Sequence, residues 1–101
     1  MASRLQLQRE LENLGIKNVW FQPPENTKLK YPAVIYKLSR LDIRHADNNP
    51  FSVKKRYNLI YITKNPDDPM LEKLAWAFPT ISYNTSYVSD KLYHHSFELY
   101  F

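Results

Sequence analysis

The sequence predicts an α+β fold, in which a mixed, mainly antiparallel β-sheet carries two α-helices on one face and a long β-hairpin projects from the sheet. Three observations lead to this prediction. Two short segments space their apolar residues as amphipathic helices do, longer segments alternate apolar with polar residues, and clusters of turn-forming residues separate them. The predicted order of elements is α-β-β-β-α-β-β, within a single domain over residues 1–101.

The first helix is predicted to begin at Ser3, which has the spacing of a capping box with the glutamine three positions later. Leu7, Leu11 and Leu14 then recur on one helical face, as expected for a helix that covers a core. Gly15 should end this helix as a left-handed cap.

A short strand and a long hairpin are predicted next. The short strand covers residues 18–22 and is closed by two prolines, which cannot donate to a ladder of hydrogen bonds. The hairpin consists of a strand over residues 33–46, a turn at 47–50 and a return strand over 53–63. Its outer end is polar and basic, and a two-stranded ribbon alone is only marginally stable in water. We therefore expect something else to order it.

Regular alternation along the first strand of this hairpin assigns its side chains to two faces. One face is predicted to carry Val34, Tyr36, Leu38 and Arg40. The other face is predicted to carry Ala33, Ile35, Lys37, Ser39 and Leu41. Both faces begin apolar, which is typical of a central strand that is buried on both sides.

The second helix is predicted after an aspartate N-cap, with Pro69 at the first helical position. Its expected apolar face consists of Met70, Leu71, Leu74, Ala75 and Phe78. Pro79 should end the helix, because proline cannot continue the hydrogen-bond pattern.

A final hairpin is predicted from strands over residues 80–87 and 92–101. In its first strand, alternation places Ile81, Tyr83 and Tyr87 on one side. In its second strand, one side is expected to carry Tyr93, His95, Phe97, Leu99 and Phe101.

Composition excludes several classes of function. The chain has no cysteine, so it contains no disulfide, and its single glycine cannot build a P-loop or a dinucleotide-binding turn. No apolar run approaches the roughly 20 residues that span a bilayer, and the first residues lack the apolar stretch of a signal peptide. We expect a cytosolic protein that makes no membrane contact. The net charge of +4 permits, but does not require, an anionic partner.

The candidate catalytic and metal-binding residues have simpler structural interpretations. His94 and His95 are adjacent in a strand, so their side chains point to opposite faces and cannot chelate one ion together. Asp67 and Asp68 with nearby Lys64 faintly resemble a magnesium-dependent nuclease site, but a turn and a helix cap account for both aspartates. We expect no catalytic residue, no metal and no cofactor.

A basic group on the long hairpin is the most informative set of candidate site residues. It consists of Arg40, Arg44, Lys54, Lys55 and Arg56. Antiparallel pairing brings these cations to the outer end of the hairpin, where they either attract an anionic partner or prevent unwanted pairing of strand edges. Several tyrosines are also candidates for stacking on nucleic-acid bases, although packing within the sheet is the favoured interpretation: Tyr57, Tyr61, Tyr83, Tyr87 and Tyr93.

Several segments of the chain resemble a family of phage proteins. They are Phe21–Glu25, Lys30–Tyr36, Ala46–Asn48, Tyr57, Asn65–Asp68 and Ser89–Tyr100. In this order they are similar to the tail terminator, or tail completion, proteins encoded in the head-to-tail module of long-tailed phages and prophages of Gram-positive bacteria. The likeness covers essentially the whole chain. It departs at residues 65–69, where the family often has an aspartate-proline-aspartate-serine turn, and at Tyr93, where it often has asparagine.

The resemblance implies a structural virion protein that is not an enzyme. Proteins of this family form a ring, expected to be hexameric, that ends polymerisation of the tail tube and presents a surface to the filled head. The implied partners are further copies of the chain, the tail tube protein and a head-tail connector protein, with transient contact to DNA passing through the lumen. The implied location is the head-tail interface of the virion, after assembly in the host cytoplasm. The basic hairpin would then line the ring or touch the tube.

Two alternatives stay open at this point. A head-completion or stopper protein on the portal side would be similarly small and basic. A small basic nucleic-acid-binding protein or nuclease, from a different functional class, is suggested by the sequence pI of about 9.3, by the tyrosines and by the Asp67–Asp68 pair.

Overall fold

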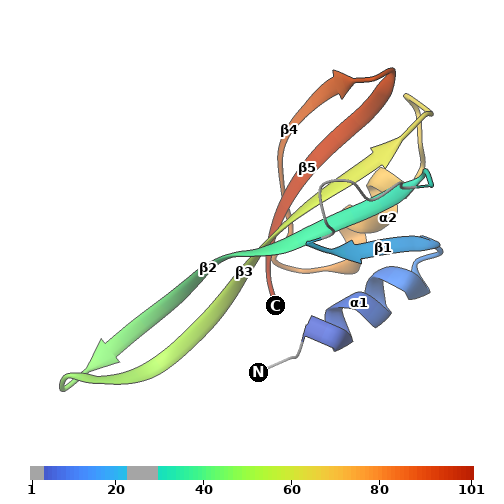
Figure 1. The fold of residues 1–101 in the computed structure, drawn as a ribbon. Helices are drawn as coiled ribbons and strands as arrows, with labels where there is room; N and C mark the ends of the chain where they lie inside the picture. The colour runs from blue at the N-terminus through green and yellow to red at the C-terminus, as the bar shows by residue number, and fades with distance from the viewer. Residues whose placement is uncertain (1–3, 23–29) are drawn as a thin grey trace.

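The computed structural model describes residues 4–22 and 30–101 and confirms the predicted fold class and order of elements. The helices are α1 (Arg4–Asn13) and α2 (Met70–Ala77), and the strands are β1 (Asn18–Phe21), β2 (Ala33–Ala46), β3 (Asn49–Thr63), β4 (Ser82–Ser89) and β5 (Leu92–Tyr100). The strands form one sheet in the order β1-β2-β3-β5-β4 (Figure 1). Of these strands, β1 and β2 pair in parallel and the other neighbours are antiparallel. Neither α1 nor α2 is long and apolar enough to cross a membrane.

Both helices pack on the same face of the sheet, as the sequence predicts. Leu7 and Leu11 of α1 and Leu74 of α2 are fully buried in one apolar cluster. From the three central strands, this cluster takes Val34, Tyr36, Tyr57, Leu59, Tyr61, Phe97 and Leu99. Because these side chains alternate along β2, β3 and β5, they define a core face, and the opposite face of the sheet carries neither helix. We call this second face the open face.

The ends of α1 follow the predicted pattern where the structure describes them. Gly15 has a φ of +103°, in the region where glycine is least strained, and its N–H donates to the carbonyl of Glu12. The predicted capping residue Ser3 lies outside the described residues.

Helix α2 begins with a polar cap supplied by the preceding turn. The Asp68 carboxylate accepts a hydrogen bond from the backbone N–H of Met70 at 2.9 Å, and Pro69 already has a helical φ of −66°. Leu74 and Phe78 are buried, but Ala75 is exposed although it was predicted on the apolar face. Its position 100° around the helix from Leu74 turns it away from the sheet.

Strands β2 and β3 form a hairpin that is longer than predicted on its return side. β3 begins at Asn49 rather than at residue 53, because the turn needs only Asp47 and Asn48, both of which have positive φ. Beyond Leu38 and Tyr57 the two strands leave the body of the protein as an extended ribbon (Figure 1). We call residues 39–56 the arm. With it, the molecule measures 51 × 30 × 24 Å.

A β-bulge at Ser39 makes the predicted face assignment wrong in the outer part of β2. Leu38 pairs with Tyr57 and Arg40 with Arg56, so Ser39 is an extra residue without an opposite partner. From this point Arg40 lies on the side of the open face, and Leu41 lies on the side of the core face. Regular alternation predicts the reverse for both residues.

A second bulge corrects the prediction for β4. Tyr83 pairs with Phe97 and Thr85 pairs with Ser96, which leaves Asn84 as the extra residue. Tyr83 therefore lies on the core face, but Tyr87 pairs with His94 and lies on the open face. The two tyrosines do not share one side of the strand, because an inserted residue reverses the alternation beyond it.

Candidate assembly surface

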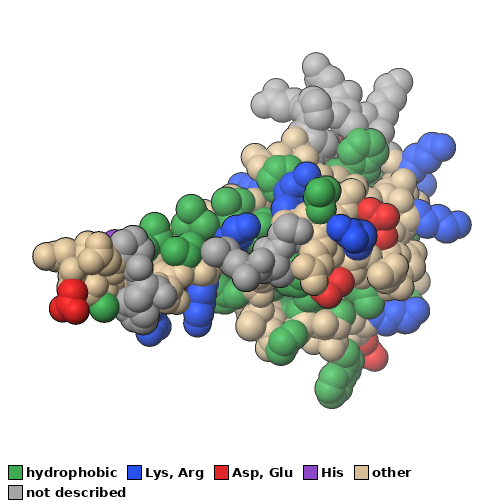
Figure 2. Space-filling view, turned by 90° about the horizontal axis from the view of Figure 1, so that it is seen from below, with side chains coloured by type: hydrophobic (Ala, Val, Ile, Leu, Met, Phe, Trp, Pro, Cys, Tyr) green, Lys and Arg blue, Asp and Glu red, His purple; other side chains and the backbone are tan. Residues whose placement is uncertain are grey.

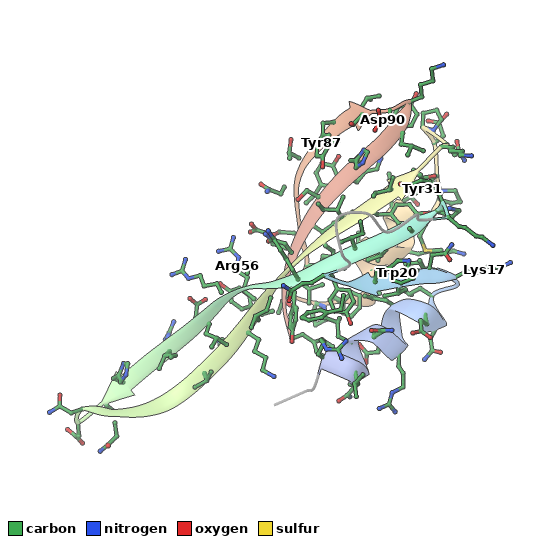
Figure 3. All side chains as sticks on the ribbon, viewed as in Figure 1. Lys17, Trp20, Tyr31, Arg56, Tyr87 and Asp90 are labelled. Atoms are coloured by element: carbon green, nitrogen blue, oxygen red, sulfur yellow. The ribbon has the colours of Figure 1, made fainter. Side chains whose placement is uncertain are left out.

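The structure distributes the predicted basic group over both faces of the arm. Arg40, Lys54 and Arg56 lie on the side of the open face, as does Arg44, which is opposite Ser52. Lys55 pairs with Leu41 and lies on the other side. Figure 3 places Arg56 where the arm leaves the body of the protein. The five cations are therefore close in space, but they do not form a single continuous patch.

Two of these five cations form ion pairs within the chain. The Arg40 guanidinium contacts the Asp42 carboxylate at 2.6 Å, and Arg56 forms an ion pair with Glu98 of β5. Arg40 and Arg56 are direct cross-strand partners, and their two positive charges repel each other unless carboxylates are close by. A hydrogen bond from Tyr100, aided by Arg40 and Arg56, lowers the pKa of Asp42, whereas a hydrogen bond to Glu98 raises the pKa of Arg56.

The remaining three cations have no acidic partner within the described part of the chain. They are Arg44, Lys54 and Lys55. All three lie around the same cleft of about 520 Å³, at the junction of the arm and the end of β5. This part of the predicted basic group is therefore available to an anionic partner.

The arm also has an apolar face that the sequence analysis did not identify. Leu41, Ile43 and Val53 of the arm lie on one side of the hairpin, and Leu38 at the root of the arm lies on the same side. Leu38, Leu41 and Ile43 are 39%, 49% and 47% exposed. Figure 2 shows hydrophobic side chains in a row along the arm, outside the body of the protein. The signal in the sequence is the alternation of Leu41 and Ile43 with charged residues, but joining Leu38 to them requires knowledge of the bulge at Ser39.

Two of the five candidate stacking residues are buried, whereas Tyr83 and Tyr87 are 54% and 48% exposed. Tyr57 and Tyr61 are buried in the core, where burial raises the pKa of both hydroxyls. The Tyr83 ring contacts Phe97 edge-on at 5.3 Å, and its hydroxyl lies 3.0 Å from Nδ1 of His95. Tyr87 stacks on His94 at 4.7 Å. These contacts favour packing within the sheet over recognition of nucleic acid.

The Asp67–Asp68 turn is explained by hydrogen bonding. Asp68 accepts hydrogen bonds from the hydroxyls of Tyr61 at 2.7 Å and Thr63 at 2.8 Å, in addition to the N–H of Met70. Burial acts to raise the pKa of Asp68, but these three donors outweigh it and the pKa is lowered. Asp67 is exposed. Within the described ranges, no three acidic or histidine side chains lie close enough together to hold a metal ion.

His95 is the one buried titratable group on β5 beside this turn. Its Nε2 atom is buried and has no hydrogen-bond partner among the described residues. Burial lowers the pKa of His95 from 6.5, and the repulsion from His94 adds to this, while the Asp68 carboxylate partly opposes it. The surroundings of His95 therefore favour the neutral imidazole.

No protein-family model matches this sequence, and no curated protein matches it.

Proposed function

We propose that this chain is a structural virion protein that forms a ring on a phage tail tube, ends tube polymerisation and provides the surface to which the head attaches. The observation that carries the proposal is the apolar face of the arm, where Leu38, Leu41 and Ile43 stay exposed in the single chain. The resemblance to tail terminators suggests which assembly this face serves.

The arm has the properties of a surface that another protein covers in an assembly. A two-stranded ribbon has no core of its own and is marginal in water, so burial of its apolar side by another protein would stabilise it. When the partner surface lies elsewhere on an identical copy, repeated head-to-tail contacts close into a ring if the rotation between neighbouring copies divides a full turn evenly. An exposed apolar row beside the charged side of the same arm fits this requirement.

The two sides of the arm suit two different partners. A terminator needs contacts with its ring neighbours and separate contacts with the tube or the head. The apolar side is suited to permanent burial between copies, whereas Arg44 and Lys54 on the other side are suited to carboxylates of the tube or to phosphates of passing DNA. This division of roles supports a terminator over a protein with a single interface.

Association is tested by replacing the apolar face without disturbing the core. The double variant Leu41→Asp, Ile43→Asp is compared with the parent chain and with Val88→Asp, a control on β4 where the side chain is 64% exposed. Light scattering over a concentration series, with negative-stain images of each species, measures ring formation. We expect rings from the parent and the control but not from the double variant, with unchanged circular dichroism in all three.

The role in the phage is tested by asking where the protein adds. Purified tail tubes and filled heads that lack tails are each mixed with the protein. Binding to tubes is expected for a terminator, whereas binding to heads alone would assign the chain to the stopper class. A parent chain that stays monomeric and binds neither particle contradicts the proposal, and rings formed equally well by the double variant contradict the role of the arm.

A further inference from the structure

The outer side of α2 carries the most exposed large apolar side chain among the described residues. Trp76 is 89% exposed, and it lies about 200° around the helix from the buried Leu74. Its indole makes no hydrogen bond and no ring contact within the described part of the chain. Tryptophan also favours a helix less than alanine, lysine or glutamate does. Neither core packing nor helix propensity explains a tryptophan here, whereas tryptophan is enriched among the residues that contribute most to binding at protein interfaces.

The whole of α2 is apolar for a helix at the surface. Six of its eight residues are apolar. One side of the helix packs on the core through Leu74, and its exposed positions include Ala75, Trp76 and Ala77. A helix that is apolar on both sides is typically covered on both sides. The outer side of α2 therefore has the properties of a surface that another protein buries.

The arm and the region around the start of α2 carry opposite charges. The arm has five cations and two aspartates, and one of the cations, Arg56, is balanced by Glu98 of β5. Residues 65–77 have three carboxylates and one lysine. Two of these carboxylates, on Asp67 and Glu72, are exposed and line the same hollow of about 390 Å³. Glu72 lies one turn before Trp76, so the surroundings of Trp76 attract a cationic arm.

The apolar row of the arm lacks the cover that the same face has in the body. Leu41 and Ile43 lie on the side that continues the core face, on which α1 and α2 pack over the body. The arm extends away from both helices, so α2 cannot cover the arm of its own chain (Figure 1). A helix laid on an apolar sheet face is the packing that the body already uses. The outer side of α2 from a second copy can cover the arm in the same way.

We propose that the outer side of α2, centred on Trp76, is the surface that receives the arm of a neighbouring copy. The Trp76 indole packs against Leu41 and Ile43 of the neighbour, and Asp67 and Glu72 lie toward the cations of the arm. This inference rests on the proposed ring, because it identifies the second surface that repeated head-to-tail contact requires. Each copy then gives its arm to one neighbour and receives on α2 the arm of the other.

The first test compares Trp76→Asp with the matched control Val88→Asp. Both substitutions introduce a carboxylate at an exposed apolar position, on α2 and on β4. Light scattering over a concentration series measures self-association, in solution and in the presence of purified tail tubes. We expect Trp76→Asp to raise the concentration needed for self-association at least about tenfold, and the control to leave it unchanged. Circular dichroism verifies that both variants fold.

The second test mixes two defective variants to identify which surfaces meet. The double variant Leu41→Asp, Ile43→Asp keeps the outer side of α2 but lacks a working arm, and Trp76→Asp has the reverse defect. One working contact remains between them, the arm of Trp76→Asp on α2 of the double variant. Their mixture should therefore form one-to-one dimers, which neither variant forms alone. Analytical ultracentrifugation measures the mass of the complex.

The third test reverses the charges around Trp76. The double variant Asp67→Lys, Glu72→Lys is compared with Glu10→Lys, Glu12→Lys, which makes the same change of net charge at exposed positions of α1. We expect the first to raise the concentration needed for self-association at least about fivefold, because it replaces an attraction to the arm by a repulsion. The α1 variant should have a much smaller effect.

Three results would overturn the inference while leaving the proposed ring intact. The first is self-association of Trp76→Asp equal to that of the parent chain. The second is rings of Trp76→Asp that no longer bind tail tubes, which would assign Trp76 to a contact with the tube protein. The third is a mixture of the two defective variants that stays monomeric although the parent associates. A parent chain that associates neither in solution nor on tubes would instead overturn the proposed function and this inference together, so the two failures are distinguishable.

Discussion

Leu38 and Leu41 lie on the same side of the β2–β3 hairpin although three positions separate them along β2. In a regular strand they would point to opposite faces. The extra residue Ser39 brings them together, and its hydroxyl donates to the carbonyl of Arg56 at 3.1 Å, which ties the bulge to the opposite strand. The apolar face of the arm thus depends on one inserted residue rather than on the spacing of leucines alone.

The stability of the protein should depend on pH through His95. The pKa of His95 is lowered in the folded state, so the unfolded chain binds more protons near and below pH 6.5. The free energy of unfolding should therefore fall as the pH drops below about 6.5, by less than about 1.4 kcal/mol per pH unit. Urea unfolding between about pH 8 and pH 5 measures this slope.

The neighbouring histidine provides the control for this effect. His94→Gln removes an imidazole that stacks on Tyr87 on the open face, whereas His95→Gln removes the buried one. We expect most of the slope to persist in His94→Gln, because burial is the main cause of the lowered pKa of His95, and the slope to decrease strongly in His95→Gln. An unchanged slope in His95→Gln would show that another group titrates.

The turn before α2 offers a second matched pair. Asp68→Ala leaves the Tyr61 hydroxyl, the Thr63 hydroxyl and the Met70 N–H without their acceptor, which should cost about 1–3 kcal/mol. Asp67→Ala removes an exposed carboxylate from the same turn and should change stability by less than about 0.5 kcal/mol. Chemical denaturation of both variants measures the difference, and equal costs would contradict the role assigned to Asp68.

Helix α2 provides a third comparison, between its inward and outward sides. Leu74 is fully buried and Trp76, two positions later, is 89% exposed. Leu74→Ala should lower the free energy of unfolding by about 2–5 kcal/mol, because it leaves a cavity in the core. Trp76→Ala should change it by less than about 0.5 kcal/mol, despite the larger deletion. Thermal and urea unfolding check both values, and a large loss in Trp76→Ala would mean that α2 packs differently.

The sequence predicts the order of elements well because each element carries its own local signal. The bounds of β2, residues 33–46, agree with the prediction, since prolines and turn residues mark both ends. The predicted assignment of side chains to the two faces of the sheet is wrong beyond Ser39 and Asn84. A bulge that contains no glycine cannot be recognised from the residue types around it. One such residue reverses every side chain that follows it.

The candidate site could be predicted only in part for a related reason. The five cations of the arm are visible in the sequence, and their convergence follows from antiparallel pairing. The sequence does not show which cations form ion pairs within the chain. Arg56 and Glu98 are 42 positions apart, and only the β3–β5 register brings them together.

The separation of the arm from the core has a consequence for how this protein can change over time. Leu7, Leu59 and Leu74 are constrained by one another, so substitution at any of them lowers folding stability. Leu41 and Ile43 contribute nothing to that cluster. The exposed residues of the arm can therefore be substituted during evolution while the body keeps its fold. A change of binding partner then requires few substitutions outside residues 39–56.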